Sequence, residues 1–301
     1  MERVYIHEVM PRDGLQNEPS FVSTEDKIRL IDRLSRTGVS KIEVTSFVSP
    51  KRVPNLRDAE EVMKGIQRVP GVCYTALVPN VKGAERALDC GVDEINVVIS
   101  ISETHNRKNV GCSVEESLDR LGKIVDLTGA TSVTVNCTLG TAFGCPYEGE
   151  IAESRLLSIV ARCVEQGVGG ISLADTTGMA NPRQVYRVCR RVKDAVPDLP
   201  LTLHFHNTRG MGLANVLEGL RAGVVRYDAS LGGIGGCPFA PGASGNICTE
   251  DLVHMLQSMG YEVPVDLDAL IRAARELQEI LDRELPGQVI KAGKATDLHP
   301  A

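Results

Sequence analysis

Short apolar runs rich in Val, Ile and Thr recur along the chain, and longer segments with helical spacing of apolar residues lie between them. Each run is short and rich in Val, Ile, Tyr, Phe or Thr, as expected of a strand buried on both faces of a parallel sheet. We predict eight strands from these runs: Val4–Val9, Lys41–Thr45, Val72–Val78, Glu94–Ser100, Ser132–Cys137, Gly170–Leu173, Leu201–Phe205 and Val224–Ala229.

The intervening segments carry the start signals of helices. Ser113 and Glu116 form a Ser-x-x-Glu capping box, and Asn181 precedes a proline at the first helical position. We predict helices over Thr24–Thr37, Ser113–Leu127, Ser154–Glu165 and Pro182–Val196, and an additional helix over Asp266–Glu284 after the last repeat.

Strands that alternate with helices indicate a parallel sheet. Eight such units in 301 residues favour a closed (β/α)8 TIM barrel over an open, doubly wound sheet. No linker rich in Pro, Gly or Ser divides the chain. We therefore expect residues 1–301 to form a single (β/α)8 barrel catalytic domain, with residues 266–301 as a C-terminal extension.

Composition narrows the class of protein. With 43% hydrophobic and 24% charged residues, the chain matches a soluble globular protein and not a disordered, collagen-like or membrane-embedded one. A net charge of −6 offers no basic face for nucleic acid. The nine cysteines include no Cys-x-x-Cys pair, and the first residues resemble no signal or transit peptide. We expect a cytoplasmic protein that binds neither nucleic acid nor membrane.

Polar and ionisable residues gather where the predicted strands end. Active sites of this barrel lie at that face, and burying so many polar groups is costly unless they bind a ligand or one another. We therefore predict that the barrel mouth is the functional site. The residues placed there are Arg12, Asp13, Glu43, Ser100, Ser102, Asn136, Asp175, His204, His206, Asp228 and Ser230.

His204 and His206 are the strongest sign of a metal site. Alternate residues of a strand point to the same side, so both imidazoles face one space. Asp13 and Asn246, the latter at the end of a glycine-dense loop over residues 232–246, add oxygen donors. This set of nitrogen and oxygen donors suits Mg²⁺ or Mn²⁺ better than zinc. The alternatives are two structural core histidines and a solvent-exposed loop.

Three further charged residues and one thiol are candidates for catalysis. We interpret Arg12, beside Asp13, as a cation that stabilises a developing oxyanion, the alternative being a surface ion pair. Glu43 and Asp175 are each a base, a carboxylate that orients a histidine, or a half-buried structural acid, and the sequence leaves these open. Cys237 lies in the glycine-dense loop, which we interpret as a mobile flap over the mouth.

Several motifs in combination resemble the 3-hydroxy-3-methylglutaryl-CoA lyase family of metal-dependent barrels. The matching segments cover nearly the whole chain and occur in the expected order. They are residues 11–18 (PRDGLQNE), 42–51 (IEVTSFVSPK), 144–149 (GCPYEG), 175–176 (DT), 204–206 (HFH), 230–238 (SLGGIGGCP) and 242–246 (GASGN).

The resemblance implies a role for each candidate residue. Arg12 would stabilise an enolate, Glu43 and Asp175 would support the site, and Cys237 would take part in proton transfer. The implied metal ligands are Asp13, His204, His206 and Asn246. The residues expected to contact substrate are Gln16, Ser102 and Asn136. The resemblance also implies a homodimer.

The reaction implied by the resemblance is the divalent-metal-dependent cleavage of 3-hydroxy-3-methylglutaryl-CoA to acetyl-CoA and acetoacetate. The family more often has Asp where this chain has Asn207, which keeps open a related substrate such as citramalyl-CoA, with pyruvate as the second product. A Claisen-type synthase is less favoured, because no regulatory domain follows the barrel. The remaining alternative is a barrel that binds metal and acyl-CoA without turnover.

Overall fold

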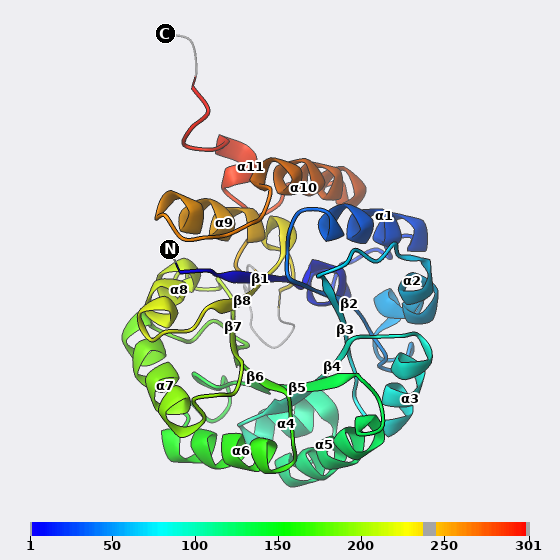
Figure 1. The fold of residues 1–301 in the computed structure, drawn as a ribbon, viewed down its shortest axis with the longest axis vertical. Coiled ribbons are helices and arrows are strands. Elements are labelled where there is room, and N and C mark those ends of the chain that lie inside the picture. The colour runs from blue at the N-terminus through cyan, green and yellow to red at the C-terminus, as the bar shows by residue number, and fades with distance from the viewer. Residues whose placement is uncertain (1, 237–244, 299–301) are drawn as a thin grey trace.

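Eight parallel strands close into a barrel in the computed structural model of the chain, which describes residues 2–236 and 245–298 (Figure 1). The strands follow one another around the ring in chain order, and β8 pairs with β1. Their bounds are β1 Tyr5–Glu8, β2 Lys41–Ser46, β3 Cys73–Leu77, β4 Glu94–Ser100, β5 Thr134–Gly140, β6 Gly170–Asp175, β7 Leu201–Phe205 and β8 Arg226–Ala229. The predicted TIM barrel is confirmed.

Helices form an outer ring around the strands (Figure 1). The predicted capping box of Ser113 and Glu116 starts α5, and Asn181 caps α7. The bounds are α1 Thr24–Ser35, α2 Ala59–Gly65, α3 Val81–Asp89, α4 Glu103–Val110, α5 Val114–Thr128, α6 Glu153–Glu165, α7 Pro182–Ala195, α8 Gly212–Arg221, α9 Thr249–Ser258, α10 Leu267–Leu281 and α11 Val289–Ala292. Within the described ranges, no helix has the length and apolar character needed to cross a bilayer.

The additional C-terminal helix is α10, which packs against α1 and α9 on the outside of the ring (Figure 1). Glu276 of α10 forms ion pairs with Arg29 and Arg33 of α1, at 2.6 and 2.9 Å. Leu270 and Leu277 bury the apolar face of the same helix. The segment after the eighth repeat therefore covers the side of the barrel next to the first helix.

Polar side chains within the barrel hydrogen-bond to one another. Asn136 Nδ2 donates to Asn96 Oδ1 and to Ser172 Oγ, each at 3.1 Å, and Thr138 Oγ1 donates to Asn96 Oδ1 at 2.8 Å. Asn96 Nδ2 in turn donates to Glu43 Oε1 at 2.8 Å. Because each amide has a partner, the barrel wall holds these groups in fixed orientations beneath the mouth.

Two buried carboxyl groups, one at the end of β1 and one on α9, hold the loop that follows the last strand. Glu8, at the end of β1, accepts hydrogen bonds from Met10 N (2.8 Å), Leu231 N (2.9 Å) and Thr249 Oγ1 (2.8 Å). Glu250 accepts a hydrogen bond from Gly232 N. Burial raises the pKa of Glu8 to about 8 and that of Glu250 to about 7, although these hydrogen bonds oppose the shift.

We expect Glu8→Gln to flatten the pH dependence of stability. The raised pKa means that the folded chain holds this proton more tightly than the unfolded chain. The resulting stabilisation is complete below about pH 4.5 and is lost as pH rises through about 8. The amide keeps an acceptor for the two backbone N–H groups but does not titrate. Urea unfolding at several pH values within this window measures the difference, on the order of a few kcal/mol.

Glu284→Gln is the matched control, because the Glu284 side chain is 75% exposed. That variant is expected to keep the pH dependence of the parent chain. If the unfolding free energy of the Glu8→Gln variant falls with rising pH as steeply as that of the parent chain, Glu8 is not the source of the pH dependence.

Candidate metal centre

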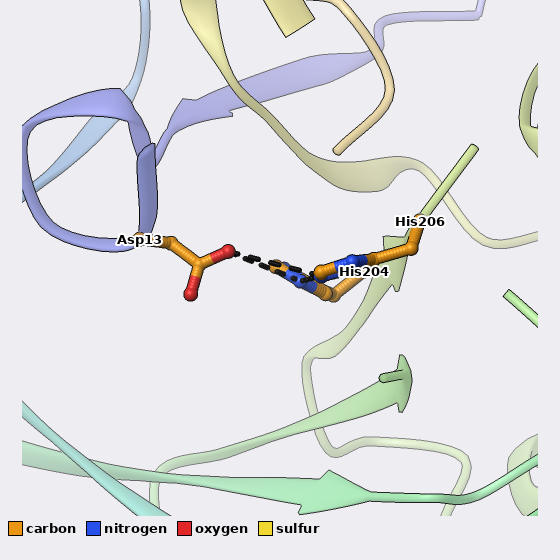
Figure 2. Close-up of side chains that lie close together, drawn as sticks. All are labelled: Asp13, His204 and His206. Carbon is orange, nitrogen blue, oxygen red and sulfur yellow. Dashed lines mark hydrogen bonds and ion pairs between the residues drawn. The ribbon is translucent and has the colours of Figure 1, made fainter. Parts of the chain in front are cut away.

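Asp13, His204 and His206 converge at the barrel mouth (Figure 2). Asp13 lies in a short π-helical turn, η1 (Met10–Gly14), directly after β1. His204 lies in β7, and His206 follows one residue beyond its end. One ligand atom of each residue lies within 4.8 Å of the others. The structure thus brings together three of the four ligands predicted from the sequence.

The donor atoms of this cluster face one another. His204 Nε2 and His206 Nε2 are 3.1 Å apart, and they lie 3.9 and 3.8 Å from Asp13 Oδ2. His204 Nδ1 lies 3.2 Å from Asp228 Oδ2, which leaves Nε2 as the nitrogen directed at the centre. Two imidazole nitrogens and a carboxylate oxygen directed at one point suit a divalent cation. The residues therefore fit the metal implied by the sequence.

Asn246, the fourth predicted ligand, lies beside this cluster. Its Nδ2 donates to Asp13 Oδ2 at 2.7 Å and to Ile234 O at 3.1 Å. His206 and Asn246 also form an isolated antiparallel bridge, which fixes the end of the glycine-dense loop against β7. The structure places Asn246 in contact with one of the three clustered donors, and its role as a direct ligand stays a prediction.

The local charges hold Asp13 and His206 in the protonation states that bind metal. Burial alone would raise the pKa of Asp13, but Arg12 and the two imidazoles lower it to about 2. Burial and the neighbouring His204 lower the pKa of His206 to about 4. Near neutral pH the carboxylate is therefore ionised and the His206 imidazole is neutral. A cation needs both of these states in its ligands. His204 is shifted the other way: burial would lower its pKa, but Asp228 and Asp13 raise it, so a bound cation would replace a proton there.

Arg12 lies between two carboxylates. Its Nη1 donates to Asp13 Oδ1 at 2.6 Å, and its Nε donates to Glu43 Oε2 at 2.5 Å. Asn96 holds the other oxygen of Glu43. Charge-assisted hydrogen bonds on two sides fix the plane of the guanidinium. Glu43 is buried against Arg12 and Asn96, and the choice between its three predicted roles stays untested.

Asp175, at the end of β6, has one oxygen engaged and one without a partner. Oδ1 accepts a hydrogen bond from Met179 N at 2.7 Å. Oδ2 is buried and has no hydrogen-bond partner among the described residues. Burial raises the pKa of Asp175 to about 6. This carboxyl group is therefore able to hold or release a proton near neutral pH, as catalysis by a base requires.

Asp228 and His7 were given no role from the sequence, although Asp228 was placed at a strand end. His7 Nδ1 lies 3.2 Å from Asp228 Oδ1, while His204 takes the other oxygen. Burial would raise the pKa of Asp228, but these two imidazoles hold it well below its usual range. Asp228 is therefore the carboxylate that contacts His204 Nδ1, a place that the sequence had left open for Glu43 or Asp175. The contact could have been predicted from the closed barrel, because β8 pairs with both β1 and β7 and so places Asp228 between His7 and His204.

The predicted substrate contacts lie in different surroundings. Asn136 belongs to the hydrogen-bonded barrel interior. Ser102 is fully buried and caps α4, where its Oγ accepts hydrogen bonds from His105 N and from Cys145 Sγ. Gln16 is half-buried just after η1. Their contact with substrate stays a prediction, and Cys237 lies outside the described residues.

Comparisons with known proteins give relatives along nearly the whole chain. Residues 3–277 match the family described as HMGL-like. Hydroxymethylglutaryl-CoA lyase of Bacillus subtilis is 46% identical over 98% of this chain and 99% of that protein. (R)-citramalyl-CoA lyase of Chloroflexus aurantiacus is 42% identical over 97% of this chain and 96% of that protein.

A solved structure is also similar to this chain along nearly its whole length. The HMG-CoA lyase of Acinetobacter baumannii, in complex with coenzyme A and 3-methylmalate, matches with a TM-score of 0.95 and 51% identity. The match covers 99% of this chain and 98% of that one.

We expect His206→Ala to weaken Mn²⁺ binding by more than the ~10- to 100-fold that follows loss of a group behind a ligand. The variant removes one of two facing imidazoles from the centre. Isothermal titration with MnCl₂ measures the dissociation constant. His254→Ala is the control, since this imidazole lies on α9 and accepts a hydrogen bond from Ala295 N. Equal Mn²⁺ affinity of His206→Ala and the parent chain would exclude His206 as a ligand.

Proposed function

The chain belongs to the HMGL-like family, and from this premise we propose that it is a carbon–carbon lyase that cleaves 3-hydroxy-3-methylglutaryl-CoA to acetyl-CoA and acetoacetate. The proposal rests on one observation: Arg12 donates a hydrogen bond to Asp13, which clusters with His204 and His206 at the barrel mouth. Two relatives that cover nearly the whole chain are lyases of this substrate by name.

The cleavage has three chemical requirements. A base must take the proton of the tertiary hydroxyl, and the bond between C2 and C3 must break as the carbonyl of acetoacetate forms. The electron pair of that bond passes to the thioester as an enolate. A proton must then reach C2 to give acetyl-CoA. A site for this reaction therefore needs positive charge at two oxygens and a group that moves protons.

Asp13, His204 and His206 are the residues that would hold the divalent cation, with Asn246 proposed as a fourth ligand. When bound, the cation supplies Lewis-acid stabilisation of negative charge on the substrate hydroxyl oxygen, an effect of several kcal/mol. We propose Mg²⁺ or Mn²⁺, because carboxylate, amide and imidazole donors without thiolate suit these ions.

Arg12 is proposed to stabilise the enolate oxygen. Two of its N–H groups are occupied by Asp13 and Glu43, and an arginine has five. The remaining N–H groups are held in a fixed plane by those two carboxylates. A donor that is oriented before reaction stabilises developing charge without reorganisation.

Asp175 and Cys237 are proposed to handle the protons. The unpartnered Oδ2 of Asp175 and its pKa of about 6 suit a group that accepts a proton from substrate near neutral pH. The resemblance of residues 230–238 to the lyase motif supports Cys237 as the donor to C2. Gln16, Ser102 and Asn136 are proposed to contact the substrate.

We also propose that the enzyme acts in the cytoplasm as a homodimer. All eight described cysteines are free thiols, which supports a reducing compartment. The homodimer rests on the resemblance stated from the sequence. Size-exclusion chromatography with light scattering measures the oligomeric state.

Citramalyl-CoA is the second candidate substrate, supported by the lyase of Chloroflexus aurantiacus. We expect the purified protein with Mg²⁺ to release acetoacetate from 3-hydroxy-3-methylglutaryl-CoA faster than pyruvate from citramalyl-CoA. Mass spectrometry of the keto acid distinguishes the two products. Faster release of pyruvate would assign the second substrate, and failure of both thioesters to yield acetyl-CoA would contradict a lyase.

We expect Arg12→Gln to lower kcat by at least ~10²-fold with little change in KM, because the lost donor acts on charge that develops only during reaction. Steady-state rates of acetyl-CoA release measure this effect. Arg221→Gln serves as control, since that side chain is 72% exposed on α8, where it pairs with Glu218 and lies over the Tyr186 ring. Turnover of Arg12→Gln close to that of the control would remove Arg12 from the mechanism.

A further inference from the structure

Two buried imidazoles and a partly buried carboxylate form a row across the wall of the barrel. His7 of β1 and His204 of β7 are both register partners of Asp228, which lies on the strand between them. Asp228 Oδ1 lies 3.2 Å from His7 Nδ1, and Asp228 Oδ2 lies 3.2 Å from His204 Nδ1. Each carboxylate oxygen is therefore used by a different imidazole.

The row extends away from the mouth on the side of His7. His7 is the register partner of Lys41 on β2, and Lys41 Nζ pairs with Glu94 Oε1 at 2.6 Å. The metal cluster therefore lies at one end of the row, and a partly buried ion pair lies at the other. Asp228 is the member that contacts both a clustered ligand and the group behind it.

We propose that Asp228 is a positioning residue that fixes His204 for metal binding, and that His7 anchors Asp228 from the opposite side. A carboxylate only accepts hydrogen bonds, so both histidines donate through Nδ1. His204 is thereby held in the tautomer whose Nε2 carries the lone pair, and that nitrogen faces Asp13 and His206. This inference rests on the proposed metal centre and deepens it.

The two histidines of the cluster differ in the hydrogen bonding of Nδ1, the ring nitrogen that faces away from the centre. His206 Nδ1 is buried and has no hydrogen-bond partner in the part of the chain that the structure describes. His204 alone has a carboxylate behind it among those residues, and that carboxylate has both oxygens engaged. Because Asp228 cannot rotate without losing one partner, it holds the ring of His204 in one orientation at the centre. Groups behind a ligand typically change metal affinity 10- to 100-fold.

The test is Mn²⁺ affinity of Asp228→Asn, measured by isothermal titration together with the thermal midpoint of the apo protein. An amide of the same size offers one oxygen to two N–H donors, so one imidazole loses its acceptor. We expect the dissociation constant for Mn²⁺ to rise ~10- to 100-fold. Electron spin-echo modulation from the imidazole nitrogens of bound Mn²⁺ is expected to change as His204 reorients.

Glu94→Gln is the matched control, because it disturbs an equally interior polar pair at the far end of the row. It is expected to lower the thermal midpoint and to leave Mn²⁺ affinity unchanged. If Glu94→Gln weakens Mn²⁺ binding as much as Asp228→Asn does, the effect is one of stability and the proposal is wrong. Parent-like affinity of Asp228→Asn also overturns it.

His7→Phe keeps the proposal testable should Asp228→Asn fail to fold. This variant leaves the His204 contact in place and removes the anchor of Asp228, so we expect a smaller loss of Mn²⁺ affinity. No loss in His7→Phe would overturn the anchoring role. A parent protein that binds no Mn²⁺ would overturn the metal centre itself, whereas tight binding by the parent and by Asp228→Asn would overturn the positioning role alone.

Discussion

The cost of burying a carboxylate and two imidazoles at one point is the constraint on which the rest of the site depends. Asp13 alone would be neutralised by burial, and Arg12 together with the imidazoles keeps it charged. Arg12 is balanced by a second carboxylate, Glu43, and His204 by a third, Asp228. Asp13, Arg12 and His204 thus each have an opposite or hydrogen-bonding partner. One donor atom of each clustered residue still faces the common centre.

Closure of the barrel makes this arrangement possible. Asp13 follows β1 and the histidines end β7, so their meeting requires β8 to pair with both of those strands. Glu8 reinforces the same seam, because it joins the turn that carries Asp13 to the start of the loop after β8. Asn246, at the far end of that loop, returns to Asp13. Fold and site therefore share one set of contacts.

The sequence was sufficient for the strands and for three clustered donors, because apolar runs mark buried strands and alternate residues face one side. It was insufficient for contacts that depend on register. The pairing of His7 with Asp228 follows only once neighbouring strands are aligned, and the partners of Glu43 depend on which way Arg12 turns. Ser102 stood near a strand end, but the local chain uses its hydroxyl to cap a helix.

The position of a bound metal tests the central claim most directly. A crystal grown with MnCl₂ and measured on both sides of the manganese absorption edge locates the ion without reference to activity. We expect one anomalous peak at the barrel mouth, with Asp13, His204 and His206 as its ligands at about 2.0–2.3 Å. A peak held by other residues, or no peak between these three side chains, would contradict the account.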